Sequence, residues 1–322
     1  MKAIAQISCV GAGLIGQGWA TLFAAHGYTL KLHDMSVRIL ESSLDQIKSN
    51  LTFFVSHDLL PEGEVDAALD RIRTTTSLDE AVENADYIQE SVYDTYEAKG
   101  ALFAELDRAA PKDAIIASSS SGLLMSRIQE KMKEPGRCVL THPFLPVHLI
   151  PLVEVVGGRN TAPEMVDATC ELLRKIGKTP VRLKKEVSGF IVNRLQAALL
   201  REAIDLVDNE VASAEDVDRA FRLSAGLRGP VLGPLLRAHL AGDGIERFFE
   251  HYAQSYRYRW ESMATWNTVS DRAAKSTIQG IREMEIVRKK SLEEIKTWRD
   301  EMVVGILEVV GGERKTTPKK SY

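Results

Sequence analysis

The sequence has few cysteines and no pair of histidines with the spacing of metal ligands, so no metal site is predicted. Its three cysteines, Cys9, Cys138 and Cys170, are an odd number placed far apart. Cys9 and Cys138 fall in predicted strands and Cys170 in a predicted helix. Buried, reduced thiols of a cytoplasmic protein are the simplest interpretation, and a disulfide framework is not expected.

The sequence also lacks a marked excess of either charge and an uninterrupted membrane-length apolar run. Lys and Arg number 41 against 45 Asp and Glu, a net charge of −4. This balance gives no electrostatic case for binding nucleic acid or an anionic membrane. Residues 3–30 carry no charged side chain, but glycines interrupt them, and the stretch before Gly11 has only the length of a strand. Neither a membrane span nor a signal peptide is therefore predicted.

What the chain does contain is an alternation of short apolar strands with amphipathic helices. Strands are expected at 4–10, 29–33, 71–75, 87–90, 114–118, 138–141, 152–156 and 179–183. Helices are expected between most of them, at 14–26, 37–55, 78–84, 96–109, 124–133 and 164–176. Such alternation implies βαβ units, so we expect an α/β fold with a Rossmann-type, mostly parallel sheet and helices on both faces.

The pattern changes near Ser188, beyond which only helical periodicity is found. The main segments are 190–209, 214–223, 231–241, 244–256 and 292–309. A length of 322 residues is enough for two domains. We therefore predict a first domain at 1–187, an all-helical domain at 188–310 and a disordered polar tail at 311–322.

A glycine-rich loop opens the first predicted helix. Residues 11–16, Gly-Ala-Gly-Leu-Ile-Gly, match G-x-G-x-x-G directly after a strand, and Asp34 ends the next strand. This context is typical of dinucleotide binding, because the helix N-terminus faces the phosphates and the acid accepts hydrogen bonds from a ribose. Asp34 would repel a 2′-phosphate and no arginine follows it, so NAD is favoured over NADP. The predicted cofactor contacts here are Gly11, Gly13, Leu14, Ile15, Gly16 and Asp34.

Four polar features are candidates for the chemistry, and two of them follow strands, where ligands bind in such a sheet. His142 follows an apolar strand, and Glu154 lies inside Leu-Val-Glu-Val-Val, where a carboxylate is costly unless paired. A histidine held by that carboxylate is a tuned general base. Ser118–Ser121 follow another strand, and Asn193 opens a helical segment. Each alone has a structural explanation: a structural histidine, a capped turn or a surface helix residue.

Together these residues resemble the 3-hydroxyacyl-CoA dehydrogenase superfamily over nearly the whole chain. The matching motifs are the glycine loop at 11–16, Ser-Ser-Ser-Ser-Gly-Leu at 118–123, Thr-His-Pro-Phe at 141–144, Leu-Val-Glu-Val-Val at 152–156 and Glu-Val-Ser-Gly-Phe-Ile-Val-Asn-Arg at 186–194. Within the superfamily the chain is most similar to the λ-crystallin and L-gulonate 3-dehydrogenase branch, through 150–154, 233–235 and 298–300. The L-carnitine dehydrogenases follow, through 141–144 and 154–158.

The resemblance implies oxidation of a hydroxyl at C3 with NAD as hydride acceptor. By position, His142 becomes the general base and Glu154 the group that orients it and stabilises its charged form. Ser121 and Asn193 become the groups that hydrogen-bond the reacting oxygen. The family's nicotinamide-ribose contacts fall on two further positions, Asp94, where glutamate is usual, and Lys99.

The departures from the family pattern bear on the substrate. Leu145 replaces the asparagine of His-x-x-Asn-Pro, and Pro151 replaces a lysine of many CoA-dependent members. Gly229-Pro230-Val231 replaces an aromatic-containing stretch after Arg228. We hypothesise that Arg228 contributes to recognition of a free carboxylate, although a solvated arginine at a helix end explains it equally well.

Three functions stay open at this point. The first is an NAD-dependent dehydrogenase of a small, free L-3-hydroxy acid, with L-gulonate or L-carnitine as examples. The second is a 3-hydroxyacyl-CoA dehydrogenase. The third is a non-catalytic, crystallin-like NAD-binding protein, against which the intact set of catalytic residues speaks.

The helical domain also carries an apolar stripe, Leu232, Leu235, Leu236 and Leu240, that needs a partner. Since such domains pair within the family, a homodimer through the helical domain is expected. The stripe fits the core of that domain equally well.

Overall fold

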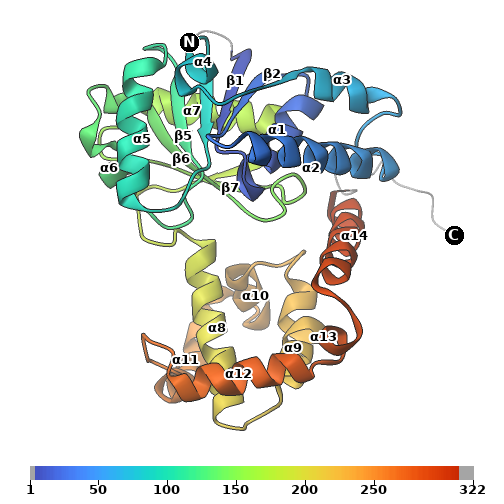
Figure 1. Ribbon diagram of the computed structural model, residues 1–322. Helices are drawn as coiled ribbons and strands as arrows, with labels where there is room; N and C mark the ends of the chain where they lie inside the picture. Colours follow the sequence, from blue (N-terminus) through green and yellow to red (C-terminus); the bar gives the residue numbers. More distant parts are fainter. Residues whose placement is uncertain (1–3, 312–322) are drawn as a thin grey trace, which may run out of the picture. The chain divides into compact units, whose positions relative to one another are not determined.

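The computed structural model describes residues 4–311, which form two compact units (Figure 1). The first unit runs to Arg194 and the second begins at Leu195. Among residues 4–311, no helix combines the length and the apolar character that a membrane span requires. Across the same described range, no group of three metal-ligating side chains is arranged to hold an ion.

An eight-stranded sheet in the order β3-β2-β1-β4-β5-β6-β7-β8 organises the first unit. The strands are β1 (Gln6–Val10), β2 (Thr29–His33), β3 (Ile72–Thr75), β4 (Tyr87–Glu90), β5 (Ile115–Ser118), β6 (Cys138–Pro143), β7 (Leu152–Gly157) and β8 (Thr179–Arg182). Neighbours from β3 to β6 are parallel, β7 is antiparallel to β6, and β8 is parallel to β7. The predicted Rossmann-type, mostly parallel sheet is confirmed.

Helices cover both faces of this sheet, with α1 and α2 on one side and α5 and α6 on the other (Figure 1). They are α1 (Leu14–Ala25), α2 (Val37–Ser56), α3 (Glu64–Asp70), α4 (Leu78–Val82), α5 (Tyr96–Ala109), α6 (Met125–Ile128) and α7 (Pro163–Lys175). Ser36, Ser77 and Thr95 cap α2, α4 and α5, each accepting a hydrogen bond from a first-turn amide. The predicted helix at 124–133 is shorter than expected, because a 3₁₀ turn, Gln129–Lys131, replaces its end.

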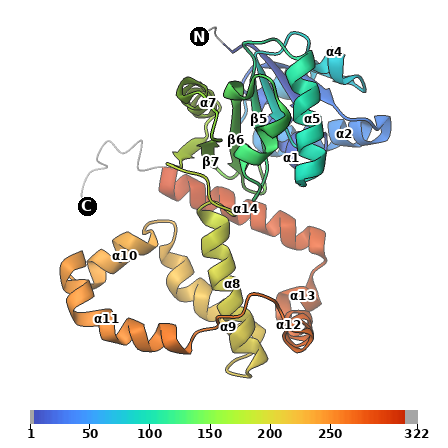
Figure 2. The ribbon, with the colours of Figure 1, turned by 90° about the vertical axis from the view of Figure 1, so that its left-hand side faces the viewer.

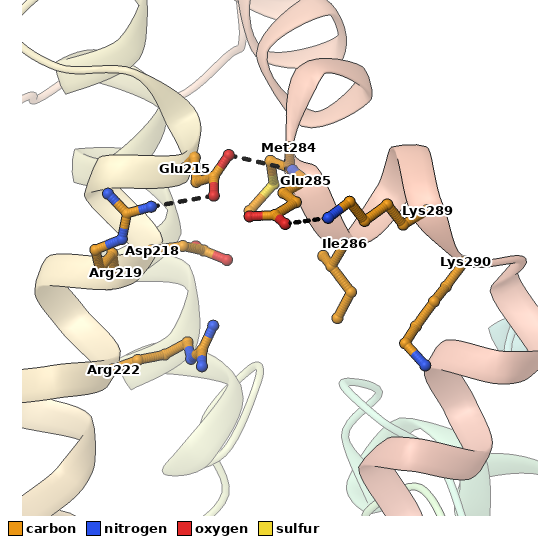
Figure 3. Close-up of a pocket in the computed structure, with 9 residues that line it drawn as sticks. All are labelled: Glu215, Asp218, Arg219, Arg222, Met284, Glu285, Ile286, Lys289 and Lys290. Carbon is orange, nitrogen blue, oxygen red and sulfur yellow. Dashed lines mark hydrogen bonds and ion pairs between the residues drawn. The ribbon is translucent and has the colours of Figure 1, made fainter.

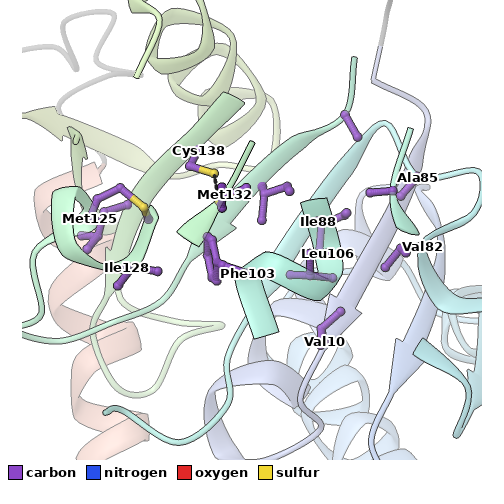
Figure 4. Packing of buried hydrophobic residues seen from close by; sticks show 14 of the residues in the cluster. Val10, Val82, Ala85, Ile88, Phe103, Leu106, Met125, Ile128, Met132 and Cys138 are labelled. Carbon is purple, nitrogen blue, oxygen red and sulfur yellow. Dashed lines mark hydrogen bonds between the residues drawn. The ribbon is translucent and has the colours of Figure 1, made fainter. Parts of the chain in front are cut away.

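The core on the α5 side shows why the strands read as continuous apolar runs. Alternate strand residues such as Val10, Ile88 and Cys138 point to this face and pack against Phe103 and Leu106 of α5 (Figure 4). Strands buried on both faces carry apolar residues on both, which is the pattern of a covered parallel sheet.

The cysteines lie where the sequence predicts, in β1, β6 and α7, and all three are free and buried. Burial raises the pKa of each thiol, that of Cys138 to about 12. These thiols are therefore protonated and unreactive at neutral pH.

The second unit is all helical in its described part (Figure 2). Counting the three residues of α8 that precede Leu195, its helices are α8 (Val192–Asp208), α9 (Ala214–Phe221), α10 (Pro234–Ala241), α11 (Ile245–Ser262), α12 (Asp271–Glu283), α13 (Glu285–Lys289) and α14 (Leu292–Gly311). Side chains of α8 fix the chain before α12, because Trp266 Nε1 donates to Asp205 at 3.1 Å. The predicted tail at 311–322 is wrong at Gly311, the last residue of α14, and its remainder lies outside the described residues.

Candidate active site

The glycine loop between β1 and α1 is shaped by contacts that only glycine allows. Gly11 has a φ of +96°, and a Cβ there would lie 2.7 Å from the Ser91 carbonyl oxygen. A Cβ at Gly16 would overlap the carbonyl oxygen of Gly11. Gly13, by contrast, is exposed at the start of α1 with no atom within 4 Å of its Cβ position. The loop thus has an open approach to backbone amides at a helix N-terminus, which fits a dinucleotide pyrophosphate.

Asp34 is held in place beside this loop at the end of β2. One carboxylate oxygen accepts a hydrogen bond from the Ala12 amide at 3.1 Å, and the other from the Ser36 amide at 3.1 Å. Lone pairs on both oxygens stay available for ribose hydroxyls. Met35, which follows, is 89% exposed and offers no charge to a 2′-phosphate. The loop and Asp34 together fit NAD.

His142 and Glu154 face each other across the antiparallel pair β6 and β7. The His142 Nδ1 and Glu154 Oε2 atoms are 2.8 Å apart, and both side chains are buried. Glu154 Oε1 accepts from the amides of Ile191 and Val192, at 2.8 and 3.0 Å, at the start of α8. Burial by itself raises the pKa of Glu154, but these hydrogen bonds from His142 and the two amides hold it below its usual range.

An ionised Glu154 can only accept a hydrogen bond, so the imidazole must donate to it from Nδ1. In the neutral imidazole the other ring nitrogen, Nε2, is then the acceptor, which is the tautomer of a general base. The rings of Phe144 and Phe190 lie 4.5 and 5.3 Å from the imidazole centroid and limit its rotation. The predicted pairing of His142 with Glu154 is present.

Ser121 and Asn193 lie against each other in the same unit. The Asn193 Nδ2 atom donates to the Ser121 carbonyl oxygen at 2.7 Å. Asn193 is joined through 191–192 to the amides that bind Glu154, so one short segment contacts both halves of the predicted site. Their predicted role, binding the reacting oxygen, stays a prediction.

Asp94 contacts Ser121. The Ser121 hydroxyl and amide both donate to Asp94 Oδ2, at 2.9 and 3.0 Å. Burial raises the pKa of Asp94, but hydrogen bonds from Ser120 and Ser121 and the charge of Lys99 keep it below the usual range. Ser121 therefore uses its single hydroxyl proton on a carboxylate, an arrangement that its position in the motif does not reveal.

Lys99 is only 1% exposed and forms a buried ion pair at 2.6 Å with Glu90, the last residue of β4. Glu90 also accepts from Ser118 at 2.7 Å and from the Val92 amide at 2.7 Å, while Lys99 lies 3.8 Å from Asp94. Lys99 thus neutralises the buried Glu90 carboxylate and lies beside Asp94. Its direct contact with a ribose stays a prediction. A carboxylate within a buried strand is the sequence signal that could predict Glu90, as it predicts Glu154.

Arg228 belongs to the second unit. It follows the π-helical segment Arg222–Gly226, is exposed, and donates from Nε to the Ser224 carbonyl oxygen at 3.2 Å. Its contribution to carboxylate binding stays a prediction.

A separate cleft of about 280 Å³ lies in the second unit between α9 and α13. Most of the charges around it are paired, Arg219 with Glu215 at 3.1 Å and Lys289 with Glu285 at 2.5 Å (Figure 3). None of the predicted site residues line it. The contacts among His142, Glu154, Ser121 and Asn193 all lie in the first unit instead.

Comparison with known proteins finds related sequences over nearly the full chain. Residues 6–187 match the model of the 3-hydroxyacyl-CoA dehydrogenase NAD-binding domain, and residues 189–280 match that of its C-terminal domain. An L-carnitine dehydrogenase of Pseudomonas sp. is 37% identical over 310 residues, 96% of this chain and 94% of its own length. The λ-crystallin homolog of Mus musculus is 37% identical over 257 residues, 80% of this chain and 81% of its own.

Among solved structures, one similar protein is the 5-formyl-3-hydroxy-2-methylpyridine 4-carboxylic acid 5-dehydrogenase, an NAD⁺-dependent dismutase. It superposes with a TM-score of 0.83 at 27% identity and covers 96% of this chain and 99% of its own.

Proposed function

The chain belongs to the 3-hydroxyacyl-CoA dehydrogenase family, and from this premise we propose that it oxidises the C3 hydroxyl of a small, free L-3-hydroxy acid with NAD. The observation that carries the proposal is the buried His142–Glu154 pair, in which Nδ1 faces the carboxylate and Nε2 is left as the acceptor of the neutral imidazole. An intact base is what alcohol oxidation needs, because the hydroxyl proton must leave as the hydride departs.

The residues have distinct tasks in this reaction. Nε2 of His142 accepts the hydroxyl proton, and the Glu154 carboxylate, 2.8 Å from Nδ1, stabilises the imidazolium that results. The amides of Ile191 and Val192 keep Glu154 ionised and fixed. The loop at 11–16 and Asp34 would hold NAD, which would supply the hydride acceptor for C3.

Ser121 and Asn193 contribute hydrogen bonds to the reacting oxygen in this proposal. One N–H of the Asn193 amide is used on the Ser121 carbonyl oxygen, and the second N–H is the donor it can offer the substrate. The Ser121 hydroxyl donates to Asp94 in this structure, so it can donate to the reacting oxygen only when it gives up that hydrogen bond. Of the two, Asn193 is therefore the donor that stabilises negative charge on the oxygen.

A free acid is favoured over a CoA ester by the departures in the segment between β6 and β7. Leu145 is half exposed there, and Pro151 stands where many CoA-dependent members carry lysine. Arg228 offers a bidentate partner for the free carboxylate. L-gulonate is the first candidate substrate, through the likeness to λ-crystallin, and L-carnitine is the alternative, through the likeness to the L-carnitine dehydrogenases.

A substrate panel with NAD reduction as readout tests the proposal. L-gulonate, L-carnitine and L-3-hydroxybutyrate are compared with 3-hydroxybutyryl-CoA at equal concentration. We expect kcat/KM to be highest for one of the free acids. A higher value for the CoA ester contradicts the free-acid proposal, and no reduction with any compound favours the crystallin-like alternative.

We further propose that two copies of the chain pair through the helical unit in the cytoplasm. Leu235, Leu236 and Leu240 of α10 are 82%, 50% and 58% exposed and form an apolar stripe of the kind that marks an interaction surface. The free, buried cysteines fit a reducing compartment. Light scattering at micromolar concentration should give twice the chain mass of 35.7 kDa, and the monomer mass contradicts the pairing.

A further inference from the structure

Lys178, the residue before β8, is a buried amine with no counter-charge. It is 5% exposed, and no carboxylate of the described residues lies within ion-pair distance of its Nζ atom. The ring of Trp19 lies near it, with its centroid 5.8 Å from Nζ. A buried lysine without a partner is costly, so its nitrogen needs another reason to be there.

The nitrogen binds two backbone carbonyls of the segment 144–151, which joins β6 to β7. Nζ donates to the carbonyl oxygens of Val147 and Ile150, the second at 2.5 Å. A neutral amine has two N–H donors for these two acceptors, and burial lowers the pKa of Lys178 to about 7. The pairing is therefore complete without a counter-ion.

The same segment is fixed from its other side by α1. Val147 is fully buried against Gly18, where an added Cβ would lie 2.7 Å from the Val147 Cβ atom. Next to Lys178, the Thr179 amide donates to the Pro151 carbonyl oxygen at 2.8 Å, which ties the end of the segment to β8. The segment is thus clamped between α1 and the start of β8.

What this clamp positions is the His142–Glu154 pair. The segment leaves β6 directly after His142 and Pro143 and enters β7 just before Glu154. Its first residue, Phe144, packs against the imidazole with ring centroids 4.5 Å apart. A shift of the segment therefore moves the Phe144 ring, which limits the orientation of the imidazole. The same shift changes the register of β6 against β7.

We propose that Lys178 is a positioning residue for catalysis, which holds the segment 144–151 so that His142 and Glu154 keep their hydrogen-bonded geometry. The inference rests on the proposed function for its kinetic consequence, but its structural consequence is measurable without any substrate. It gives Lys178, which touches neither member of the pair, a defined part in the reaction.

The test compares Lys178→Met with Lys175→Met, a matched change of an exposed lysine at the end of α7. Methionine keeps an unbranched side chain, one atom shorter than that of lysine, and removes the donors. We expect kcat with the best acid of the substrate panel to fall roughly 100-fold in Lys178→Met, as for a misplacement of about 1 Å. The Kd for NAD should change less than about threefold, and Lys175→Met should match wild type.

Two readouts separate positioning from a general loss of stability. The downfield NMR resonance of the His142 Nδ1 proton should shift or disappear in folded Lys178→Met, and the amides of Leu149 and Ile150 should exchange faster while those of β1 stay protected. These readouts hold even if the panel yields no substrate, so failure of the proposed function is recognised separately. An unshifted Nδ1 resonance together with kcat within about threefold of wild type overturns the proposal.

If Lys178→Met does not fold, Gly18→Ala decides, because its Cβ displaces Val147 from the opposite side. It should lower kcat and perturb the same Nδ1 resonance while NAD still binds. An unchanged resonance and kcat in Gly18→Ala also overturn the proposal.

Discussion

Replacement of Glu154 by glutamine tests how the carboxylate sets the tautomer of His142. The carboxylate accepts three hydrogen bonds, from His142 Nδ1 at 2.8 Å and from two backbone amides at 2.8 and 3.0 Å. In Glu154→Gln the amide oxygen can still accept from the two backbone amides. Its NH₂ group then faces Nδ1, which must become an acceptor, so the imidazole proton moves to Nε2.

An imidazole protonated at Nε2 cannot take the hydroxyl proton. Placing a catalytic histidine in the wrong tautomer lowers kcat by roughly 10³–10⁴-fold, which is about 4–5.5 kcal/mol of activation free energy. The loss of a charged acceptor costs about 1.5–3 kcal/mol of folding stability. The variant should therefore fold, bind NAD normally and turn over very slowly.

The assay is kcat from NAD reduction, with the Kd for NAD measured by fluorescence in the same preparation. Glu164→Gln, an exposed carboxylate in the first turn of α7, is the matched control and should behave as wild type. If Glu154→Gln keeps kcat within tenfold of wild type, the carboxylate does not set the tautomer and the reasoning fails.

Three further predictions follow from the structure. Asp34→Asn removes the charge beside the ribose site, and the ratio of kcat/KM for NAD over NADP should fall by tenfold or more; an unchanged ratio means that Asp34 does not select the cofactor. Arg228→Met should raise KM for the acid substrate by at least tenfold with little change in kcat, and an unchanged KM refutes its carboxylate contact. Burial raises the pKa of Asp107, but its ion pair with Arg137 at 3.0 Å keeps that pKa below the unfolded value. The free energy of unfolding should therefore fall as the pH drops from about 5 through the folded pKa. Urea unfolding at pH 6 and pH 3.5 should show a smaller loss in Asp107→Asn than in wild type, and equal losses contradict this assignment.

The sequence predicts the strands of the first unit best where a recognisable pattern sets their limits. β2 and β4 match their predicted bounds, and β2 does so through alternation of apolar and polar residues in Thr-Leu-Lys-Leu-His. The direction of β7 was not anticipated, although the segment 144–151 is too short for the crossover that a parallel β6–β7 pair needs. That length is the signal that predicts the antiparallel pair.

Three helices were missed. α3 and α13 are short and rich in charged side chains, whereas α12 carries apolar residues at helical spacing, such as Ala274, Ile278 and Ile281, a pattern that was overlooked. The predicted helix at 214–223 changes to π-helical geometry at Arg222, which no residue pattern announces. Periodicity predicts only helices that bury one face.

At the site, the sequence predicted a pairing where a charged side chain lies in a buried strand. Glu154 needed a partner inside a strand and has one in His142. The hydrogen bond from Ser121 to Asp94 and the ion pair of Lys99 with Glu90 were not foreseen, because they join turns and strand ends whose spacing only the folded sheet fixes. The role of Lys178 is of the same kind, since its acceptors are backbone carbonyls that carry no side-chain signal.

The most direct test of the central claim is the comparison of wild type with His142→Ala on the best free acid of the panel. General base catalysis is worth about 10²–10⁴-fold, so kcat should fall by that factor while the Kd for NAD stays unchanged. Near-full activity of His142→Ala would contradict the account.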